Sequence, residues 1–198
     1  MWNERYAEPG FAYGTEPNDF LKAQAELLPA QGRALELCAG EGRNGVWLAQ
    51  RGLQVTSVDG SAVGLAKAEE LARQRGTSLR TVVSDLAAYD VAAERWDVIV
   101  SISAHLPRLL RQQIHAACVR ALVPGGLLVL EAYTPAQVAR GTGGPRDPEM
   151  CMTLEGLRQE LAGLSFLHGV ECDREIHEGK WHGGVSSVVQ VVARKPLA

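Results

Sequence analysis

The stretch Arg33-Ala-Leu-Glu-Leu-Cys-Ala-Gly-Glu-Gly-Arg-Asn-Gly45 decides the fold of this chain. It begins as a short apolar run and passes into a loop with glycines at 40, 42 and 45, after which a helical pattern starts at Val46. When a strand, a glycine loop and a helix follow one another in this order, the bare main chain of the loop faces the same gap as the N–H groups at the start of the helix. An anionic or polar ligand can lie in such a gap. The stretch therefore predicts a cofactor-binding loop.

Two classes of cofactor use such a loop, and the spacing Gly40-x-Gly42-x-x-Gly45 alone is a weak match to the dinucleotide fingerprint. The second apolar run, residues 53–58, ends in Asp59 and Gly60, about 20 residues after the first loop glycine. A carboxylate at that strand tip accepts the hydroxyls of a ribose, which a nicotinamide dinucleotide and S-adenosylmethionine both carry. Asp59 therefore leaves both cofactors open.

Three further features distinguish the two classes. Glu36 lies inside the first apolar run, where a buried strand of a dinucleotide-binding fold is normally apolar throughout. The third run, residues 79–86, carries Ser84 and Asp85 at its carboxyl end, a suitable place for an adenine amino group. Residues 122–131 combine a helix end, a Pro-Gly-Gly turn and another buried strand. These features favour S-adenosylmethionine.

Together, the four motifs resemble those of class I S-adenosylmethionine-dependent methyltransferases, over residues 32–133. The resemblance implies that the loop backbone holds the amino-acid part of S-adenosylmethionine, with Glu36 beneath it. It also implies that Asp59 holds the ribose, and that Asp85 and the Leu86 backbone hold the adenine. The residues expected to bind the cofactor are Tyr13, Glu36, Cys38, Gly40, Gly42, Arg43, Asn44, Asp59, Gly60, Ser84, Asp85, Leu86 and Ser101.

The implied fold class is α/β: one doubly wound, Rossmann-like and mostly parallel seven-stranded sheet, with helices on both faces and a C-terminal hairpin. We expect a single domain over residues 1–198. Its expected parts are an N-terminal lid segment and helix (1–31), a cofactor-binding core (32–133), a lid loop with a short helix (134–162) and the closing hairpin (163–198). Helices are expected at residues 20–28, 44–51, 61–75, 108–122 and 154–161, with Ser61 and Thr153 as caps.

The first 17 residues are rich in aromatic and turn-forming side chains but show no clear period. The pattern Trp-x-x-Arg-Tyr, then Tyr13-Gly14-x-x-Pro17-Asn18-x-Phe20-Leu21, looks like the N-terminal cofactor lid of small methyltransferases similar to the thiopurine and tellurite-resistance enzymes. The alternative is that these aromatic residues only seal the core. Both readings remain open.

His105 follows the fourth expected strand, at the carboxyl edge where ligands bind in a doubly wound sheet. It is the candidate catalytic residue, a general base for a hydroxyl or amine acceptor, because its ordinary pKa lies near neutral pH. The alternative is a hydrogen-bonded wall residue. The other four histidines have no motif around them, so packing or surface roles are expected: His115, His168, His177 and His182.

Composition limits the partners. The net charge of −3 and pI near 6.0 argue against a dedicated nucleic-acid surface, and no apolar run is long enough to cross a membrane. The four cysteines show no metal-ligand spacing, so no metal site is expected. We expect a cytoplasmic monomer or weak homodimer acting on a small-molecule methyl acceptor, which could be a thiol, metalloid oxyanion, amine or hydroxyl.

Two alternatives come from other functional classes. One is an NAD(P)-dependent oxidoreductase, which the expected closing hairpin and Asp85 oppose, as does the missing Tyr-x-x-x-Lys spacing of small reductases. The other is a non-catalytic S-adenosylmethionine-binding protein. A pure binder would not need a closed pocket facing the cofactor's methyl group, lined by His105, Tyr133 and the lid.

Overall fold

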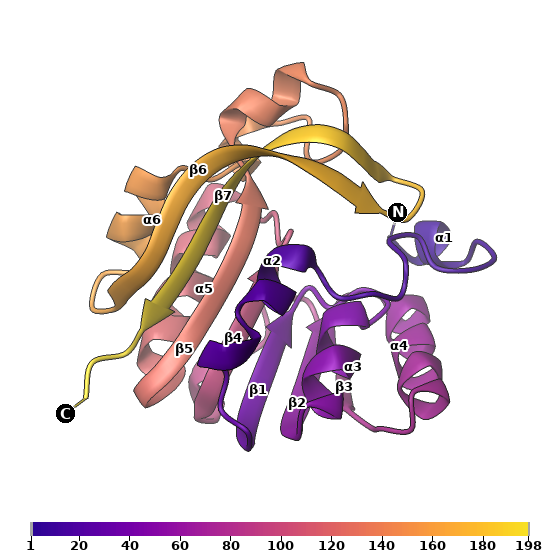
Figure 1. The fold of residues 1–198 in the computed structure, drawn as a ribbon, viewed down its shortest axis with the longest axis horizontal. Coiled ribbons are helices and arrows are strands. Elements are labelled where there is room, and N and C mark those ends of the chain that lie inside the picture. The colour runs from indigo at the N-terminus through magenta and orange to yellow at the C-terminus, as the bar shows by residue number, and fades with distance from the viewer. Residues whose placement is uncertain (1, 198) are drawn as a thin grey trace.

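The computed structural model describes residues 2–197, in which seven strands form a single sheet with helices on both faces (Figure 1). The strands are β1 (Gly32–Leu37), β2 (Leu53–Asp59), β3 (Arg80–Val83), β4 (Trp96–Ile102), β5 (Leu122–Tyr133), β6 (Ser165–Glu178) and β7 (His182–Arg194). Their spatial order is β3-β2-β1-β4-β5-β7-β6, and β7 runs antiparallel to its neighbours β5 and β6. The expected doubly wound sheet with a closing hairpin is confirmed.

Helices precede, connect and follow these strands. They are α1 (Trp2–Tyr6), α2 (Asp19–Ala23), α3 (Arg43–Gln50), α4 (Ala62–Gln74), α5 (Arg108–Ala121) and α6 (Leu154–Glu160), with 3-10 turns η1 (Ala25–Leu27), η2 (Val91–Ala93), η3 (Pro135–Ala139) and η4 (Pro148–Met150). The expected caps are confirmed, because Ser61 Oγ accepts the Gly64 N–H and Thr153 Oγ1 accepts the Gly156 N–H, each at 3.1 Å. No helix within residues 2–197 has the length and apolar content to cross a bilayer.

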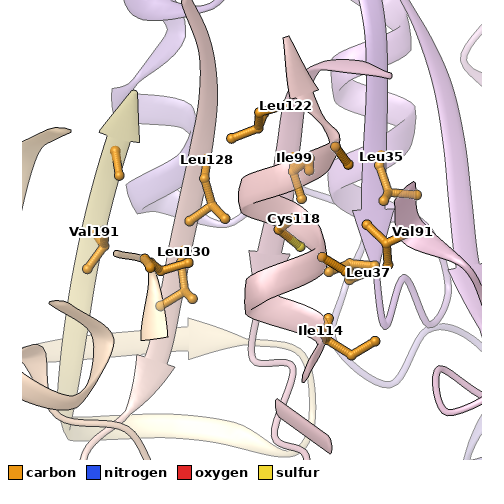
Figure 2. Close-up of a cluster of buried hydrophobic side chains, with 14 of the residues drawn as sticks. Leu35, Leu37, Val91, Ile99, Ile114, Cys118, Leu122, Leu128, Leu130 and Val191 are labelled. Atoms are coloured by element: carbon orange, nitrogen blue, oxygen red, sulfur yellow. The ribbon is translucent and has the colours of Figure 1, made fainter. Parts of the chain in front are cut away.

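The alternation of side chains along β1 explains the two halves of the core. Leu35 and Leu37 face α5 and pack with Ile114 and Cys118, as Figure 2 shows. Ala34 faces the opposite way and packs with the α2 and α3 side of the sheet. Glu36 follows the same period as Ala34, so its carboxylate points toward α3. This alternation positions a carboxyl group beneath the glycine loop.

Two expected elements are shorter in the structure. The expected strand 79–86 contains only β3, because the chain turns at Asp85, whose carbonyl oxygen accepts the N–H groups of Ala88 and Tyr89. The single helix expected over residues 20–28 is wrong: α2 ends at Ala23 and a separate 3-10 turn follows. Leu28 is extended, as a residue before a proline is biased to be.

The Pro-Gly-Gly turn expected before the fifth strand lies inside β5 instead. The pairing of β5 with β4 shifts register between Trp96 and Val98, which is the mark of a bulge. Gly125 adopts φ +81 there, and a Cβ on Gly126 would lie 2.9 Å from the Val123 carbonyl oxygen. The bulge thus needs glycine at both positions. Residues 134–152 of the expected lid loop contain the 3-10 turns η3 and η4.

Candidate active site

The carboxyl ends of β1 and β4 meet where the strand order reverses, which is the usual ligand site of such a sheet. Cys38 follows β1 with φ +53, and Ser103 follows β4 with φ +55. Within the described residues these are the only non-glycine residues with positive φ. A positive φ at a non-glycine residue costs about 1–3 kcal/mol, and it persists only where the surrounding structure imposes it. Backbone strain is thus concentrated on both sides of the crevice.

Asp59 connects the two loops on the β2 side of this crevice. Its Oδ2 accepts the Gly40 N–H and its Oδ1 accepts the Ser61 N–H, both at 2.8 Å. Burial raises the pKa of Asp59, while these two hydrogen bonds oppose that rise. Each oxygen has a further lone pair, so the carboxylate can hold the loops and still accept ribose hydroxyls. The adjoining Gly60 is exposed.

The glycine loop follows the tight course that its sequence predicts. Gly40 adopts φ +55 and Gly42 φ +80. A Cβ on Gly42 would lie 2.4 Å from the Ala68 Cβ on α4, and one on Gly40 would lie 2.7 Å from the Tyr6 hydroxyl. Larger residues would therefore push the loop away from α4 and from the N-terminal helix.

Glu36 lies beneath this loop and is 2% exposed. Its Oε2 accepts the Ser57 hydroxyl at 2.7 Å and the carboxylate also accepts the Gly45 N–H, but Oε1 has no partner within the described residues. Burial raises the pKa of Glu36 to about 7. A buried acceptor oxygen without a partner, under a glycine loop, fits a ligand that brings an ammonium group. The residues present therefore fit S-adenosylmethionine.

The residues expected at the adenine differ in exposure. Asp85 is exposed, and its Oδ1 accepts the Ala87 N–H at 2.8 Å. The Ser84 hydroxyl donates to the Asp85 carbonyl at 3.0 Å. Leu86 packs in the α5 side of the core, and Ser101 is buried in β4. Asp85 is therefore reachable by a ligand, whereas Leu86 and Ser101 can contribute mainly through their backbone.

Three other expected cofactor residues contact the covering segments. Arg43 Nη2 lies 2.7 Å from Glu178 Oε2 at the end of β6, and Asn44 Oδ1 accepts the Asn18 N–H at 2.8 Å. The Tyr13 hydroxyl accepts from Arg5 Nη1 at 2.7 Å. The start of α3 is thus bonded to both the N-terminal segment and the hairpin.

These covering segments also contact each other, beside the carboxyl edge of the sheet (Figure 1). The Lys180 N–H donates to the Ala12 carbonyl at 2.9 Å. The Arg5 guanidinium lies 4.9 Å from the ring centres of both Trp2 and Trp181. Residues 2–13 and the hairpin tip therefore form one layer over the site.

A buried polar network lies beneath that layer, and the sequence analysis did not find it. Asn18 Nδ2 donates to Glu131 Oε1 at 2.8 Å and to Glu178 Oε1 at 2.9 Å. Arg174 and Gln190 also donate hydrogen bonds to the Glu131 carboxylate, and the shortest bond from each residue is 2.6 Å long. Burial opposes ionisation of Glu178, but donors that include His182 and Arg43 outweigh it and hold the pKa of Glu178 below its usual range.

His105 lies at the expected edge, but both of its ring nitrogens contact main chain. Nδ1 lies 3.1 Å from the Met150 carbonyl oxygen, and Nε2 accepts the Tyr133 N–H at 3.4 Å. Burial lowers the pKa of His105 to about 4. The ring is also stacked on Tyr133, with 5.5 Å between centroids. This geometry favours the wall role over the general base.

Tyr133 ends β5 inside a crevice that is too narrow for a water molecule. The lining residues are Ser103, Glu131, Ala132, Tyr133, Ile176, Glu178 and Val188. A larger groove of about 440 Å³ lies elsewhere, beside α5, α6 and η4. Its Arg111 and Glu160 pair with each other at 2.9 Å, so that groove is built around a satisfied ion pair away from the glycine loop.

Comparison with known proteins agrees with this geometry. The family model of a methyltransferase domain matches residues 34–126. A glycine/sarcosine N-methyltransferase of Halorhodospira halochloris is 36% identical over 104 residues, which are 50% of this chain and 39% of that protein. A tRNA 5-carboxymethoxyuridine methyltransferase of Escherichia coli (strain K12) is 31% identical over 122 residues, 58% of this chain and 45% of that protein. The chain spans less than half the length of these curated relatives.

Solved structures share the fold. TehB from Haemophilus influenzae aligns with a TM-score of 0.71 at 22% identity, over 89% of this chain and 61% of that chain. The N-methyltransferase NodS from Bradyrhizobium japonicum WM9, in complex with S-adenosyl-l-homocysteine, aligns with a TM-score of 0.71 at 18% identity. The alignment covers 98% of this chain and 96% of that chain. These structural alignments cover more of the chain than the family model does, so the fold is shared beyond the residues that the model matches. Residues 34–126 therefore match the methyltransferase-domain family, and the whole chain shares its fold with solved methyltransferases, one of them bound to S-adenosyl-l-homocysteine, which supports S-adenosylmethionine as the cofactor.

Proposed function

We propose that this protein transfers the methyl group of S-adenosylmethionine to a small-molecule nucleophile. The observation that carries the proposal is the buried Oε1 of Glu36 beneath the Gly40 loop, which has no hydrogen-bond partner among residues 2–197. A carboxylate oxygen in that state is complementary to the cofactor's ammonium group. The bound cofactor supplies an electrophilic methyl group on a sulfonium.

The proposed roles of the cofactor residues follow from their places. Gly40 and Gly42 let the amino-acid part lie against bare main chain, and the start of α3 presents N–H groups to it, with Glu36 beneath. Asp59 holds the loops and accepts the ribose hydroxyls, while Asp85 lies at the tip of β3 for the adenine. The chain's own contribution to the reaction is to orient the two reactants and exclude water, since in-line transfer needs no covalent intermediate.

A small acceptor is supported by how the site is covered. Residues 2–13 and the hairpin tip meet over the crevice, and Gly179 packs against Ala12 and Tyr13. A closed layer of this kind leaves little surface for a large substrate. The glycine/sarcosine N-methyltransferase, a relative of this chain, acts on small amines by its name.

A second candidate is an RNA acceptor, because another relative is a tRNA methyltransferase. The net charge of −3 opposes it, since binding a phosphate backbone requires clustered basic side chains. A third reading, a protein that binds the cofactor without catalysis, lacks a reason for the closed crevice at Tyr133. The cytoplasmic location and the monomeric or weakly dimeric state stay predictions.

The test is transfer of a labelled methyl group from S-adenosylmethionine in two parallel assays. One offers the low-molecular-weight fraction of a bacterial extract, and the other offers total tRNA. Label incorporated only into the small-molecule fraction supports the proposal. Label in tRNA alone would favour the second candidate, and bound cofactor without transfer in either assay would favour the non-catalytic reading.

A further inference from the structure

Tyr133 carries a hydroxyl group that nothing in the described chain satisfies. The residue is 2% exposed, and its hydroxyl has no hydrogen-bond partner within residues 2–197. Buried tyrosine hydroxyls usually find a partner, and leaving one unpaired costs about 1–3 kcal/mol. Burial, followed by the nearby charges of Glu178 and Glu131, raises the pKa of Tyr133. The group therefore stays protonated and can donate a hydrogen bond to a ligand.

The loop after β5 closes on this hydroxyl through glycines. A Cβ on Gly144 would lie 2.5 Å from Tyr133 Cδ2. A Cβ on Gly143 would lie 2.9 Å from His182 Cδ2 and 3.1 Å from the Tyr133 hydroxyl oxygen. The phenol hydroxyl and one edge of the imidazole therefore both lie against Gly143, so an acceptor reaches them where the segment around Gly143 moves aside.

His182 is oriented for a proton transfer in this place. Its Nδ1 lies 3.3 Å from Glu178 Oε2, and its ring meets Tyr133 edge to face with 5.5 Å between centroids. An ionised carboxylate at Nδ1 fixes the neutral tautomer with the proton on Nδ1. Nε2, bonded to Cδ2 on the Tyr133 side, is then the nitrogen with a lone pair. His105, whose nitrogens both contact main chain, has no such free nitrogen.

The charges around the crevice cancel in pairs. Glu178 is paired with Arg43 at 2.7 Å, and Glu131 with Arg174 at 2.6 Å. The remaining titratable groups that face His182 are Tyr13, Tyr133 and His105. Two carboxylates and two guanidinium groups give no net attraction for an oxyanion or a thiolate. A neutral acceptor fits the site better.

We propose that His182 is the general base, that Tyr133 donates a hydrogen bond to the acceptor, and that the acceptor is a small neutral amine or hydroxyl compound. This inference rests on the proposed function. The acceptor's nitrogen or oxygen forms the bond to the methyl carbon, and the methyl–sulfur bond breaks with its electron pair left on sulfur. The proton of the acceptor passes to Nε2 of His182. Glu178 acts through His182 and is a positioning residue.

The experiment measures labelled methyl transfer from S-adenosylmethionine to four probes: aniline, phenol, 2-mercaptoethanol and tellurite. The wild type is compared with His182→Gln and Tyr133→Phe. The matched controls are His177→Gln, an exposed histidine paired with Glu175 on the same hairpin, and Tyr89→Phe, a half-buried tyrosine outside the crevice. Calorimetric binding of S-adenosylhomocysteine to every variant accompanies the assay.

We expect transfer to aniline or phenol and not to the thiol or tellurite. His182→Gln should lower kcat by roughly 100-fold or more and remove the rising limb of the pH profile, because loss of a general base has this effect. Glu178→Gln should shift that limb to lower pH, since the imidazolium loses its carboxylate partner. Tyr133→Phe should raise KM about 10-fold without lowering the unfolding midpoint, because the deleted hydroxyl has no partner in the described part of the chain.

Three results would overturn the inference. These are transfer only to the thiol or tellurite, transfer to none of the probes by a protein that binds S-adenosylhomocysteine, and unchanged kinetics in His182→Gln. Failure of the wild type to bind S-adenosylhomocysteine would instead overturn the proposed function beneath it. The two failures are therefore distinguishable in the same set of samples.

Discussion

Arg43 and Glu178 are 135 residues apart in sequence, yet the guanidinium Nη2 of Arg43 lies 2.7 Å from the Glu178 carboxylate. Arg43 begins the helix after the glycine loop, and Glu178 ends β6, the first strand of the closing hairpin. Both side chains are nearly buried. The pair therefore connects the loop assigned to the cofactor with the segment that covers the acceptor crevice.

Breaking this pair should destabilise the fold. Arg43→Ala leaves the Glu178 charge buried without its main counter-ion, and we expect the free energy of unfolding to fall by about 3 kcal/mol. Urea-induced unfolding measures the change. The matched control is Arg73→Ala, which breaks an exposed pair with Glu70 and should cost about 0.5 kcal/mol or less. Equal losses of unfolding free energy in the two variants would show that the buried pair stabilises the fold no more than the exposed pair does.

Glu36 should give the stability a distinct pH dependence. Burial raises the pKa of Glu36 to about 7 in the folded chain, while the unfolded value is about 4.3. Between these values the folded protein holds a proton that the unfolded chain has lost. The free energy of unfolding therefore falls as pH rises through this window, by about 4 kcal/mol in total, and this contribution is constant above it.

Glu36→Gln should remove that contribution, so the variant should lose less stability than the wild type between about pH 5 and pH 8. Urea unfolding at the two pH values measures the difference. Parallel curves for the two proteins would mean that Glu36 is already ionised at the lower pH.

Cofactor binding should release a proton near pH 7. If the ammonium group of S-adenosylhomocysteine meets Oε1 of Glu36, its charge favours the carboxylate and lowers the pKa of Glu36. The heat of binding should then depend on the ionisation enthalpy of the buffer, and should do so much less in Glu36→Gln. Heats that match in phosphate and Tris buffers would contradict this role of Glu36.

Gly45 should not tolerate alanine although it lies in a helix. A Cβ there would lie 2.3 Å from Glu36 Oε2 and 2.6 Å from Ser57 Oγ. Overpacking of this kind costs about 1–3 kcal/mol, which outweighs the gain of about 1 kcal/mol in helix propensity. Thermal unfolding of Gly45→Ala should show a lower midpoint. Gly183→Ala, where a Cβ meets nothing within 4 Å, is the control and should leave it nearly unchanged.

The fold was predictable because its signals are local. Ser61 and Thr153 each precede a helical pattern and do cap helices, and Glu36 was notable as a carboxylate inside an apolar run. The bulge at Gly125 and Gly126 was not predictable, because its cause is the register with β4 on another part of the chain.

The buried network was missed for the same physical reason. Asn18 bonds to Glu131 and Glu178, which lie 113 and 160 residues away, so no periodicity connects them. One signal was available: Glu131 interrupts the apolar run of β5 as Glu36 interrupts that of β1. His182 had no comparable signal, because its partner Glu178 gains its importance from the fold around it.

The most direct test of the central claim is calorimetric titration of the protein with S-adenosylmethionine, S-adenosylhomocysteine and NADH, repeated on Asp59→Ala. Asp97→Ala is the matched control, because Asp97 accepts the Arg33 N–H at 2.7 Å near the start of β1 and β4, at the opposite edge of the sheet. We predict binding of both adenosyl ligands by the wild type and Asp97→Ala, its loss in Asp59→Ala, and no heat with NADH. Binding of NADH alone, or undiminished binding of the adenosyl ligands by Asp59→Ala, would contradict the cofactor site described above.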